Sequence, residues 1–388
     1  MTIAPDAASG HRREVSLRVQ SFSPRISDPA GRACGWGFVA PLIKRWLLPV
    51  AMTAMSSLAI AGDTSSGSTG LQREVIFTDY APVASSTELM QRLMSPLRAA
   101  RVRVELARSR KQMREQAIDL SHERFAVYVP KRPPDSGYAL LVFVPPWQNA
   151  ILPQRWAPEL DRNGMIYVSA ANSGNAESIL DRREPLALLA AHNIMQRYPV
   201  NSQRVYIAGF SGGSRVALRI ALGYPDVFHG ALLIAGSDPI GDAQAPLPAT
   251  ELFWQFQTST RLVYLTGNYD SLNVEQDAAS RQSLREWCVF GLDSEIMSRA
   301  GHELPDPGSL NRALQTLIDP VQIDPTKLAA CRARVEGALG GGLQKVTEFV
   351  ARDNRRNAWK LLDSIDSRYG GLALPRSVEL AEQINARR

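Results

Sequence analysis

The chain of 388 residues contains only three cysteines and five histidines. The cysteines stand far apart, at Cys34, Cys288 and Cys331, so the sequence has no zinc-finger spacing. It also lacks a basic stretch interleaved with aromatic residues, which make up only 7% of the chain. These absences leave a nucleic-acid-binding role without support.

Long apolar runs are scarce too, and the one that stands out lies near the amino terminus. Lys44 and Arg45 precede an apolar run from Trp46 to Ala61, and a polar stretch rich in Gly and Ser follows. This order is typical of a signal peptide cleaved after Ala61, and a membrane anchor is the alternative. We expect residues 1–61 to be a signal region with an extended or mis-assigned start. The remainder is then periplasmic or secreted, without stable membrane insertion.

The chain beyond residue 61 is nearly neutral and keeps two cysteines. Residues 1–61 hold seven Lys and Arg against three Asp and Glu, so the net charge of +6 falls to +2 for the rest. Cys288 and Cys331 either form a disulfide in an oxidising compartment or remain two buried free thiols. The sequence leaves both open. A disulfide would connect the region before His302 to the carboxyl-terminal helices.

The most informative stretch is Gly209-Phe210-Ser211-Gly212-Gly213, a serine between two near glycines. The β-branched and aromatic run before it, Val205–Ala208, predicts a buried strand, and apolar residues at helical spacing up to Gly223 predict a helix after it. Another buried strand is expected at 231–235. A serine at such a strand-turn-helix junction forms a nucleophile elbow, so Ser211 is the candidate nucleophile.

Histidine is rare enough for chain order to identify a base. A serine nucleophile needs a general base and an acid that orients the base, and in this arrangement the order is serine, acid, histidine. Only His302 follows both Ser211 and a candidate acid. It lies in a glycine-flanked loop, which suits a side chain that must reach across strand ends. We expect His192 and His229 to be structural.

The orienting acid is expected at the end of a strand. The run 261–266 predicts a strand, which enters a loop at Gly267-Asn268-Tyr269-Asp270. Asp270 is therefore the expected acid. Asp277 and Asp293 are the alternatives, although lone aspartates are usually solvated surface groups.

With these motifs, residues 115–318 resemble an α/β-hydrolase of the esterase and polyhydroxybutyrate-depolymerase-like group. The resemblance implies an α/β fold with a mostly parallel central sheet flanked by helices. It implies a triad of Ser211, Asp270 and His302, and an acyl-enzyme formed on Ser211. It further implies that no cofactor and no metal take part.

One segment departs from this resemblance, because many relatives carry a His-Gly pair where this chain has Pro145-Pro146-Trp147-Gln148. Proline has no N–H, so the first oxyanion donor must be the backbone of Trp147 or of Gln148, with Gly212 as the second. Loss of one such donor costs about 3 kcal/mol of transition-state stabilisation. The departure therefore puts the strength of catalysis in question.

Substrate class is less constrained by the sequence. Trp147 and Phe210 are candidate walls of an acyl pocket, since aromatic residues near strand ends can line one, although most aromatics are core. Further candidates are Trp156, Phe253, Trp254, Phe256 and Trp287. We expect a small-molecule or polymeric carboxylic ester as substrate. The alternatives are an exported peptidase with the same triad, and a hydrolase-fold binding protein that has lost turnover.

Three regions are expected after the signal region. Residues 62–114 form a linker and lead-in, in which Ser85 caps a helix whose face includes Leu89, Leu93 and Leu97. Residues 115–320 form the catalytic domain. The opening strands are expected within the runs 117–130, 138–144 and 165–170.

Residues 321–388 are expected to form a small helical appendage. Apolar spacing predicts helices that are interrupted by glycine, at 328–339, 343–352, 358–369 and 377–384. A helical-hairpin module of this kind is suited to protein contacts, so a protein partner is a further expectation.

Overall fold

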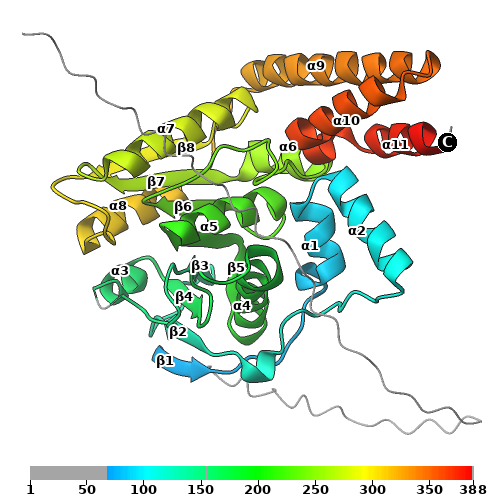
Figure 1. The fold of residues 1–388 in the computed structure, drawn as a ribbon. Coiled ribbons are helices and arrows are strands. Elements are labelled where there is room, and N and C mark those ends of the chain that lie inside the picture. Colours follow the sequence, from blue (N-terminus) through cyan, green and yellow to red (C-terminus); the bar gives the residue numbers. More distant parts are fainter. Residues whose placement is uncertain (1–67, 154, 387–388) are drawn as a thin grey trace, which may run out of the picture.

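The computed structural model describes residues 68–153 and 155–386. The strands in this part of the chain are β1 (Gly70–Val75), β2 (Phe125–Val129), β3 (Tyr138–Val144), β4 (Met165–Ala170), β5 (Val200–Phe210), β6 (Gly230–Ile234), β7 (Arg261–Gly267) and β8 (Leu292–Met297). They form one sheet in the spatial order β1-β2-β4-β3-β5-β6-β7-β8 (Figure 1). β2 pairs antiparallel with β1 and β4, and the other neighbouring pairs are parallel. The expected mostly parallel α/β sheet is confirmed.

The central strands are buried on both faces. Every residue of β3, β4 and β6 is buried, as the continuous apolar runs of a covered parallel sheet require. Along β3, Leu140 and Val142 pack into one core, whereas Leu141 and Phe143 pack into the other. β3 and β4 have the bounds that the sequence predicts.

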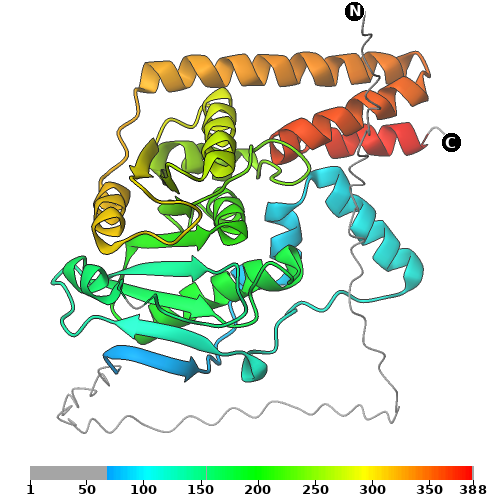
Figure 2. The same ribbon diagram turned by 60° about the vertical axis from the view of Figure 1, so that its left-hand side comes forward.

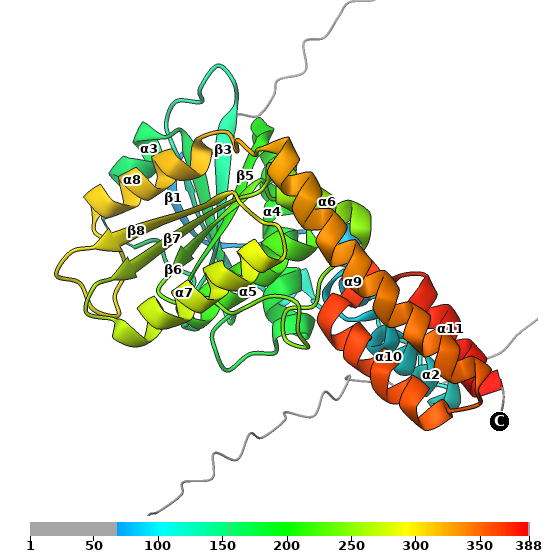
Figure 3. The same ribbon diagram turned by 90° about the horizontal axis from the view of Figure 1, so that it is seen from above.

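Helices cover both faces of the sheet, as the view in Figure 3 shows. One face carries α3 (Ala157–Arg162) and α8 (Pro307–Ile318). The opposite face carries α1 (Ser86–Leu93), α4 (Glu184–Arg197), α5 (Gly212–Gly223), α6 (Thr250–Ser259) and α7 (Ser271–Glu286). None of the helices in residues 68–153 and 155–386 combines the length and the apolarity needed to cross a membrane. The predicted signal region lies outside the described residues.

The lead-in differs from the prediction in two ways. Its first segment, β1, pairs with β2, so the sheet already begins at Gly70. A domain boundary at 114/115, as expected from the sequence, would place β1 outside the domain that contains the rest of its sheet. The helix capped by Ser85 ends at Leu93, and Pro96 begins a second helix, α2 (Pro96–Ser109). The expectation of one helical face is therefore wrong: Leu93 packs against the sheet, whereas Leu97 packs into a separate helical core.

That core belongs to a helical module, which consists of α2, α9 (Pro325–Ala351), α10 (Arg355–Tyr369) and α11 (Arg376–Ala386). The module lies beside the sheet domain. Its longest helix, α9, extends from the sheet domain to the other helices of the module (Figure 2). Asp366 of α10 accepts hydrogen bonds from Ser95 Oγ and the Leu97 N–H at the start of α2. Segments from both ends of the described chain therefore share one core.

The glycines at 340–342 do not interrupt a helix, which corrects the prediction of separate helices at 328–339 and 343–352. Each glycine in a helix interior costs about 1 kcal/mol relative to Ala. Here α10 packs along α9, and a Cβ on Gly342 would lie 3.2 Å from Ile365 Cδ1. At Gly342, the close approach of α10 requires a small residue, and the packing of α10 along α9 keeps the helix continuous through the three glycines.

A disulfide joins Cys288, directly after α7, to Cys331 in α9, with the Cα atoms 5.7 Å apart. Of the two possibilities left open by the sequence, the structure has the disulfide. It attaches α9 to the sheet domain.

Candidate functional site

Ser211 occupies a sharp turn between β5 and α5. Its backbone angles are φ 55° and ψ −122°, a strained region for a residue with a side chain. Only glycine fits on either side: a Cβ on Gly209 would lie 2.2 Å from the Gly213 carbonyl oxygen, and one on Gly213 would lie 2.0 Å from the Val144 oxygen. The two glycines are therefore required by backbone packing at the elbow.

The three residues expected to act together form one chain of hydrogen bonds. His302 lies in the loop after β8, and its Nε2 is 3.0 Å from Ser211 Oγ. Its Nδ1 is 2.6 Å from Oδ2 of Asp270, which follows β7. The carboxylate accepts from Nδ1–H, so Nε2 is left as the acceptor for the serine proton. The sequence-predicted serine, acid and histidine thus meet at one edge of the sheet.

Asp270 has a further partner that sequence reasoning missed. Asn273, one turn into α7, donates from Nδ2 to both carboxylate oxygens, at 2.9 and 2.8 Å. Burial would raise the pKa of Asp270, but the hydrogen bonds from His302 and Asn273 outweigh it and hold this pKa below its ordinary value. The carboxylate is therefore kept ionised and oriented toward the imidazole. No helix was predicted after Asp270, so no sequence signal marked Asn273.

On the other side of Ser211, the diproline segment lies against residues 172–175. The Asn175 N–H donates to the Pro146 oxygen at 3.0 Å, and the Asn172 N–H donates to the Gln148 oxygen at 2.6 Å. In a trans peptide the carbonyl and the following N–H point in opposite directions. The Trp147 N–H therefore points away from Asn175.

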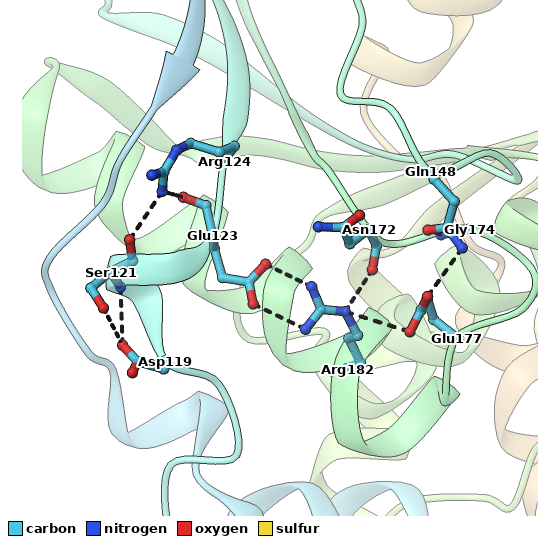
Figure 4. A network of polar contacts seen from close by, with 9 residues as sticks. All are labelled: Asp119, Ser121, Glu123, Arg124, Gln148, Asn172, Gly174, Glu177 and Arg182. Carbon is cyan, nitrogen blue, oxygen red and sulfur yellow. Dashed lines mark hydrogen bonds and ion pairs between the residues drawn. The ribbon is translucent and has the colours of Figure 1, made fainter.

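Three backbone N–H groups beside the elbow donate to no acceptor in the described residues, those of Trp147, Gln148 and Gly212. Within the part of the chain that the structure describes, neither the Trp147 N–H nor the Gly212 N–H donates a hydrogen bond. The Gln148 N–H likewise donates no hydrogen bond in this part of the chain. The Gln148 side chain accepts from the Gly174 N–H and donates to Glu177 (Figure 4). Trp147 and Gln148 therefore both stay candidates for the first oxyanion donor, with Gly212 as the second.

The sheet order and the position of the three side chains together decide the fold. β2 runs antiparallel to its neighbours, the serine follows β5, the acid follows β7 and the histidine follows β8. The chain has the α/β-hydrolase fold.

Solved structures with this fold resemble the chain only remotely. Dipeptidyl peptidase 4 of Porphyromonas gingivalis matches at 15% identity and a TM-score of 0.37, over 51% of this chain and 34% of that protein. S-formylglutathione hydrolase of Staphylococcus aureus matches at 12% and 0.39, over 51% and 93%. Acetyl xylan esterase of Aspergillus awamori matches at 13% and 0.39, over 50% and 94%. The chain spans about a third of the peptidase.

No family model matches this α/β-hydrolase chain, and no curated protein matches its sequence. The fold assignment therefore depends on the strand order and the elbow.

The alternative acids of the α/β-hydrolase domain lie outside the hydrogen-bonded chain. Asp277 is buried and accepts from Ser237 and Thr266; burial raises its pKa, against the effect of these bonds. Asp293 pairs with Arg261 at the amino end of β7. Of the three aspartates, Asp270 alone contacts His302 among the described residues.

The alternative histidines are also remote. The backbone of His229 bonds to Val205 and Arg261, at the start of the parallel strands, and its side chain is partly buried. Burial lowers the pKa of His229. His192 lies within α4. Neither forms a hydrogen bond with Ser211 or Asp270 in the described part of the chain.

The candidate pocket aromatics fall into two groups. Phe210 stacks on the His302 ring, with centroids 4.9 Å apart, and Trp147 lies 6.2 Å from Phe210, so both border the site. The other candidates do not, which corrects the prediction. Trp156 is core, and its Nε1 donates to the Pro305 oxygen. Around α6 and the disulfide lie Phe253, Trp254, Phe256 and Trp287.

Asn175 borders the elbow as well, although sequence reasoning did not single it out. A Cβ on Gly212 would lie 2.3 Å from Asn175 Oδ1, so the carboxamide packs on the Gly212 Cα. No sequence pattern marks this contact. In residues 68–153 and 155–386, no cluster of three or more His, Cys, Asp or Glu has a geometry that could hold a metal ion.

Proposed function

We propose that the protein is an exported serine hydrolase that cleaves carboxylic esters. The observation that carries the proposal is the continuous hydrogen-bonded chain from Ser211 Oγ through His302 to Asp270. A serine hydroxyl becomes a nucleophile when a neutral imidazole accepts its proton and a carboxylate fixes the imidazole tautomer.

In the proposed reaction, Ser211 Oγ attacks the ester carbonyl carbon while its proton passes to His302 Nε2. The carbonyl oxygen becomes an oxyanion, which accepts hydrogen bonds from the N–H groups of Gly212 and Trp147. Collapse of this intermediate breaks the bond to the alcohol, which leaves with the proton from His302. Water then attacks the acyl-enzyme with His302 as base, which releases the acid and regenerates Ser211.

Export is supported by two features. The amino-terminal pattern predicts a signal region, and the disulfide between Cys288 and Cys331 is of the kind that persists in oxidising compartments. A protein partner for the helical module remains a prediction from its helical character. The location is tested by fractionating cells that express the full chain and by determining the mature amino terminus.

The reaction is tested by measuring hydrolysis of p-nitrophenyl esters of several acyl lengths and of peptide anilides by the purified mature protein. We expect ester turnover that disappears in Ser211→Ala. Preferential cleavage of the anilides would instead make the protein a peptidase. Absence of both activities in folded protein would favour the binding protein.

A further inference from the structure

A buried arginine lies next to the diproline segment and has no role in the proposed chemistry so far. Arg183 ends a π-helical turn, η3 (Ile179–Arg183), and is 3% exposed. Its Nε donates to the Ser173 oxygen at 2.9 Å, and its terminal nitrogen donates to the Pro145 oxygen at 2.9 Å. Among the described residues, no carboxylate pairs with it. Burial lowers its pKa to about 10, although Glu184 and Glu177 act in the opposite direction.

Such an arrangement is costly for stability alone. A buried charge without an ion-pair partner loses much of its hydration, and two neutral carbonyls compensate for only part of that loss. At this cost, Arg183 joins two backbone segments, Pro145–Gln148 and Asn172–Asn175. These are the segments that border the elbow.

The two prolines explain why a side-chain donor binds the backbone at Pro145. Neither proline has an N–H, so the backbone of these two residues can be hydrogen-bonded only through its carbonyl groups. Arg183 binds the Pro145 oxygen, and the Asn175 N–H binds the Pro146 oxygen at 3.0 Å. Together they fix the plane of the peptide that carries the Trp147 N–H.

The neighbouring Arg182 binds the Asn172–Asn175 segment, as Figure 4 shows at Asn172. Its Nε donates to the Asn172 oxygen at 2.6 Å, and its two terminal nitrogens bind both oxygens of Glu123, at 3.0 and 2.7 Å. Arg182 is bound to a carboxylate and contacts only one of the two segments. Arg183 is the one that spans both.

We propose that Arg183 is a positioning residue that holds the Pro146–Trp147 peptide so that its N–H is aimed at the developing oxyanion. This inference rests on the proposed function. Pro145 and Pro146 cannot supply an alternative N–H. A small rotation of the Pro146–Trp147 peptide therefore removes one of the two hydrogen bonds to the oxyanion. Displacement of a catalytic group by about 1 Å can reduce the rate about 100-fold.

The test compares Arg183→Met and Arg183→Lys with the matched control Arg261→Met. The Arg261 guanidinium also binds two backbone carbonyls, those of Asp319 and Pro320, but at the amino end of β7. We expect Arg183→Met to lower kcat for an ester by about 30-fold with KM changed less than threefold, because the defect lies in the transition state. Arg183→Lys keeps the charge but not the two-pronged geometry, so we expect an intermediate loss. The control should keep kcat within about twofold of the original protein.

A second measurement does not depend on turnover. Hydrogen exchange should be faster in Arg183→Met at the N–H groups of Asn172 and Asn175, which bind the diproline segment, while β5 and β6 stay protected. Unchanged exchange together with unchanged kcat overturns the proposal, as does an equal loss in the Arg261→Met control. If the original protein hydrolyses no ester, the proposed function fails, and faster exchange at these two positions still supports the positional role of Arg183. If Arg183→Met does not fold, the same two readouts on Arg183→Lys decide.

Discussion

The two sides of Ser211 are organised by different kinds of contact. On the acid side, His302 bonds directly to both Ser211 and Asp270, and Asn273 bonds to Asp270. On the oxyanion side, the N–H groups of Trp147 and Gly212 have no protein acceptor among the described residues. Arg183 binds the neighbouring backbone at the Ser173 and Pro145 carbonyl oxygens. Reactive side chains can fix one another, whereas a free N–H can be fixed only through the rest of its peptide.

This difference predicts how the two sides respond to mutation. Loss of a side chain on the acid side removes a reacting group or its immediate partner. Loss of a side chain on the oxyanion side changes an angle, so the effect should be smaller than loss of a reacting group and confined to kcat. The changes that follow are ordered from the largest expected effect to the smallest.

Asp270→Asn should lower kcat by about 10⁴-fold near neutral pH, because the amide favours the wrong imidazole tautomer at His302. The melting temperature should fall only modestly, since the two side chains have nearly the same shape but the amide cannot accept from Asn273 on both of its atoms. Steady-state kinetics with a p-nitrophenyl ester and thermal melting give both values. A loss below tenfold would mean that another carboxylate orients His302, and Asp277→Asn is the matched comparison.

Trp147→Pro should lower kcat by about 100-fold, because it removes the N–H assigned to the oxyanion. Trp147→Phe keeps that N–H and an aromatic ring, so its kcat should stay within about tenfold of the original value. Both variants are compared by kcat on the same ester, with melting as the check on folding. Equal losses would show that the ring matters rather than the donor, and would return the assignment to Gln148.

Asn273→Ala should lower kcat by about tenfold, because Asp270 loses two hydrogen bonds that orient it. Against the effect of burial, the bond from His302 and, to a smaller extent, those from Asn273 hold the pKa of Asp270 below its ordinary value. The stabilisation from this depressed pKa is therefore present above the ordinary pKa and is lost as pH falls through the folded-state value. In the variant the pKa rises, so we expect stability to fall at a higher pH on acidification.

Melting temperatures between about pH 2 and pH 5 follow this shift. Gln282→Ala is the control, because Gln282 lies on the same helix, α7, and its side chain bonds only to Glu286 among the described residues. A profile of Asn273→Ala that coincides with that of the control would contradict the role assigned to Asn273.

Gln148→Ala should have the smallest effect, about a fivefold loss in kcat. The variant loses side-chain bonds to the Gly174 N–H and Glu177 but keeps the backbone bond from Asn172 and both contacts of Arg183. The ratio of its kcat to that of Arg183→Met measures how much of the alignment depends on each side chain. A larger loss in Gln148→Ala than in Arg183→Met would make Gln148, rather than Arg183, the main support of the Trp147 peptide.

How much of this site the sequence reveals follows from the same difference. The elbow depends on five consecutive residues, and chain order with scarce histidine identifies His302 and Asp270, so the acid side was predictable except for Asn273. Arg183 reaches Pro145 across 38 positions, and Asn175 reaches Gly212 across the elbow. Nothing in local spacing marks contacts of that length.

The fold shows the same limit. Buried parallel strands have continuous apolar runs, so β3 and β4 were predicted with their bounds. β1 is an edge strand in which no residue is fully buried, so its sequence GLQREV carries little apolar signal. The glycines at 340–342 suggested a break because helix propensity is local, whereas the packing of α10 on α9 is tertiary.

The central claim is that Ser211 is an activated nucleophile, and covalent labelling by a fluorophosphonate tests it most directly. We predict one adduct on the purified mature protein, mapped to Ser211 by peptide mass spectrometry and absent from both Ser211→Ala and His302→Ala. Folded protein that forms no adduct, or an adduct that persists in His302→Ala at the original rate, would contradict it.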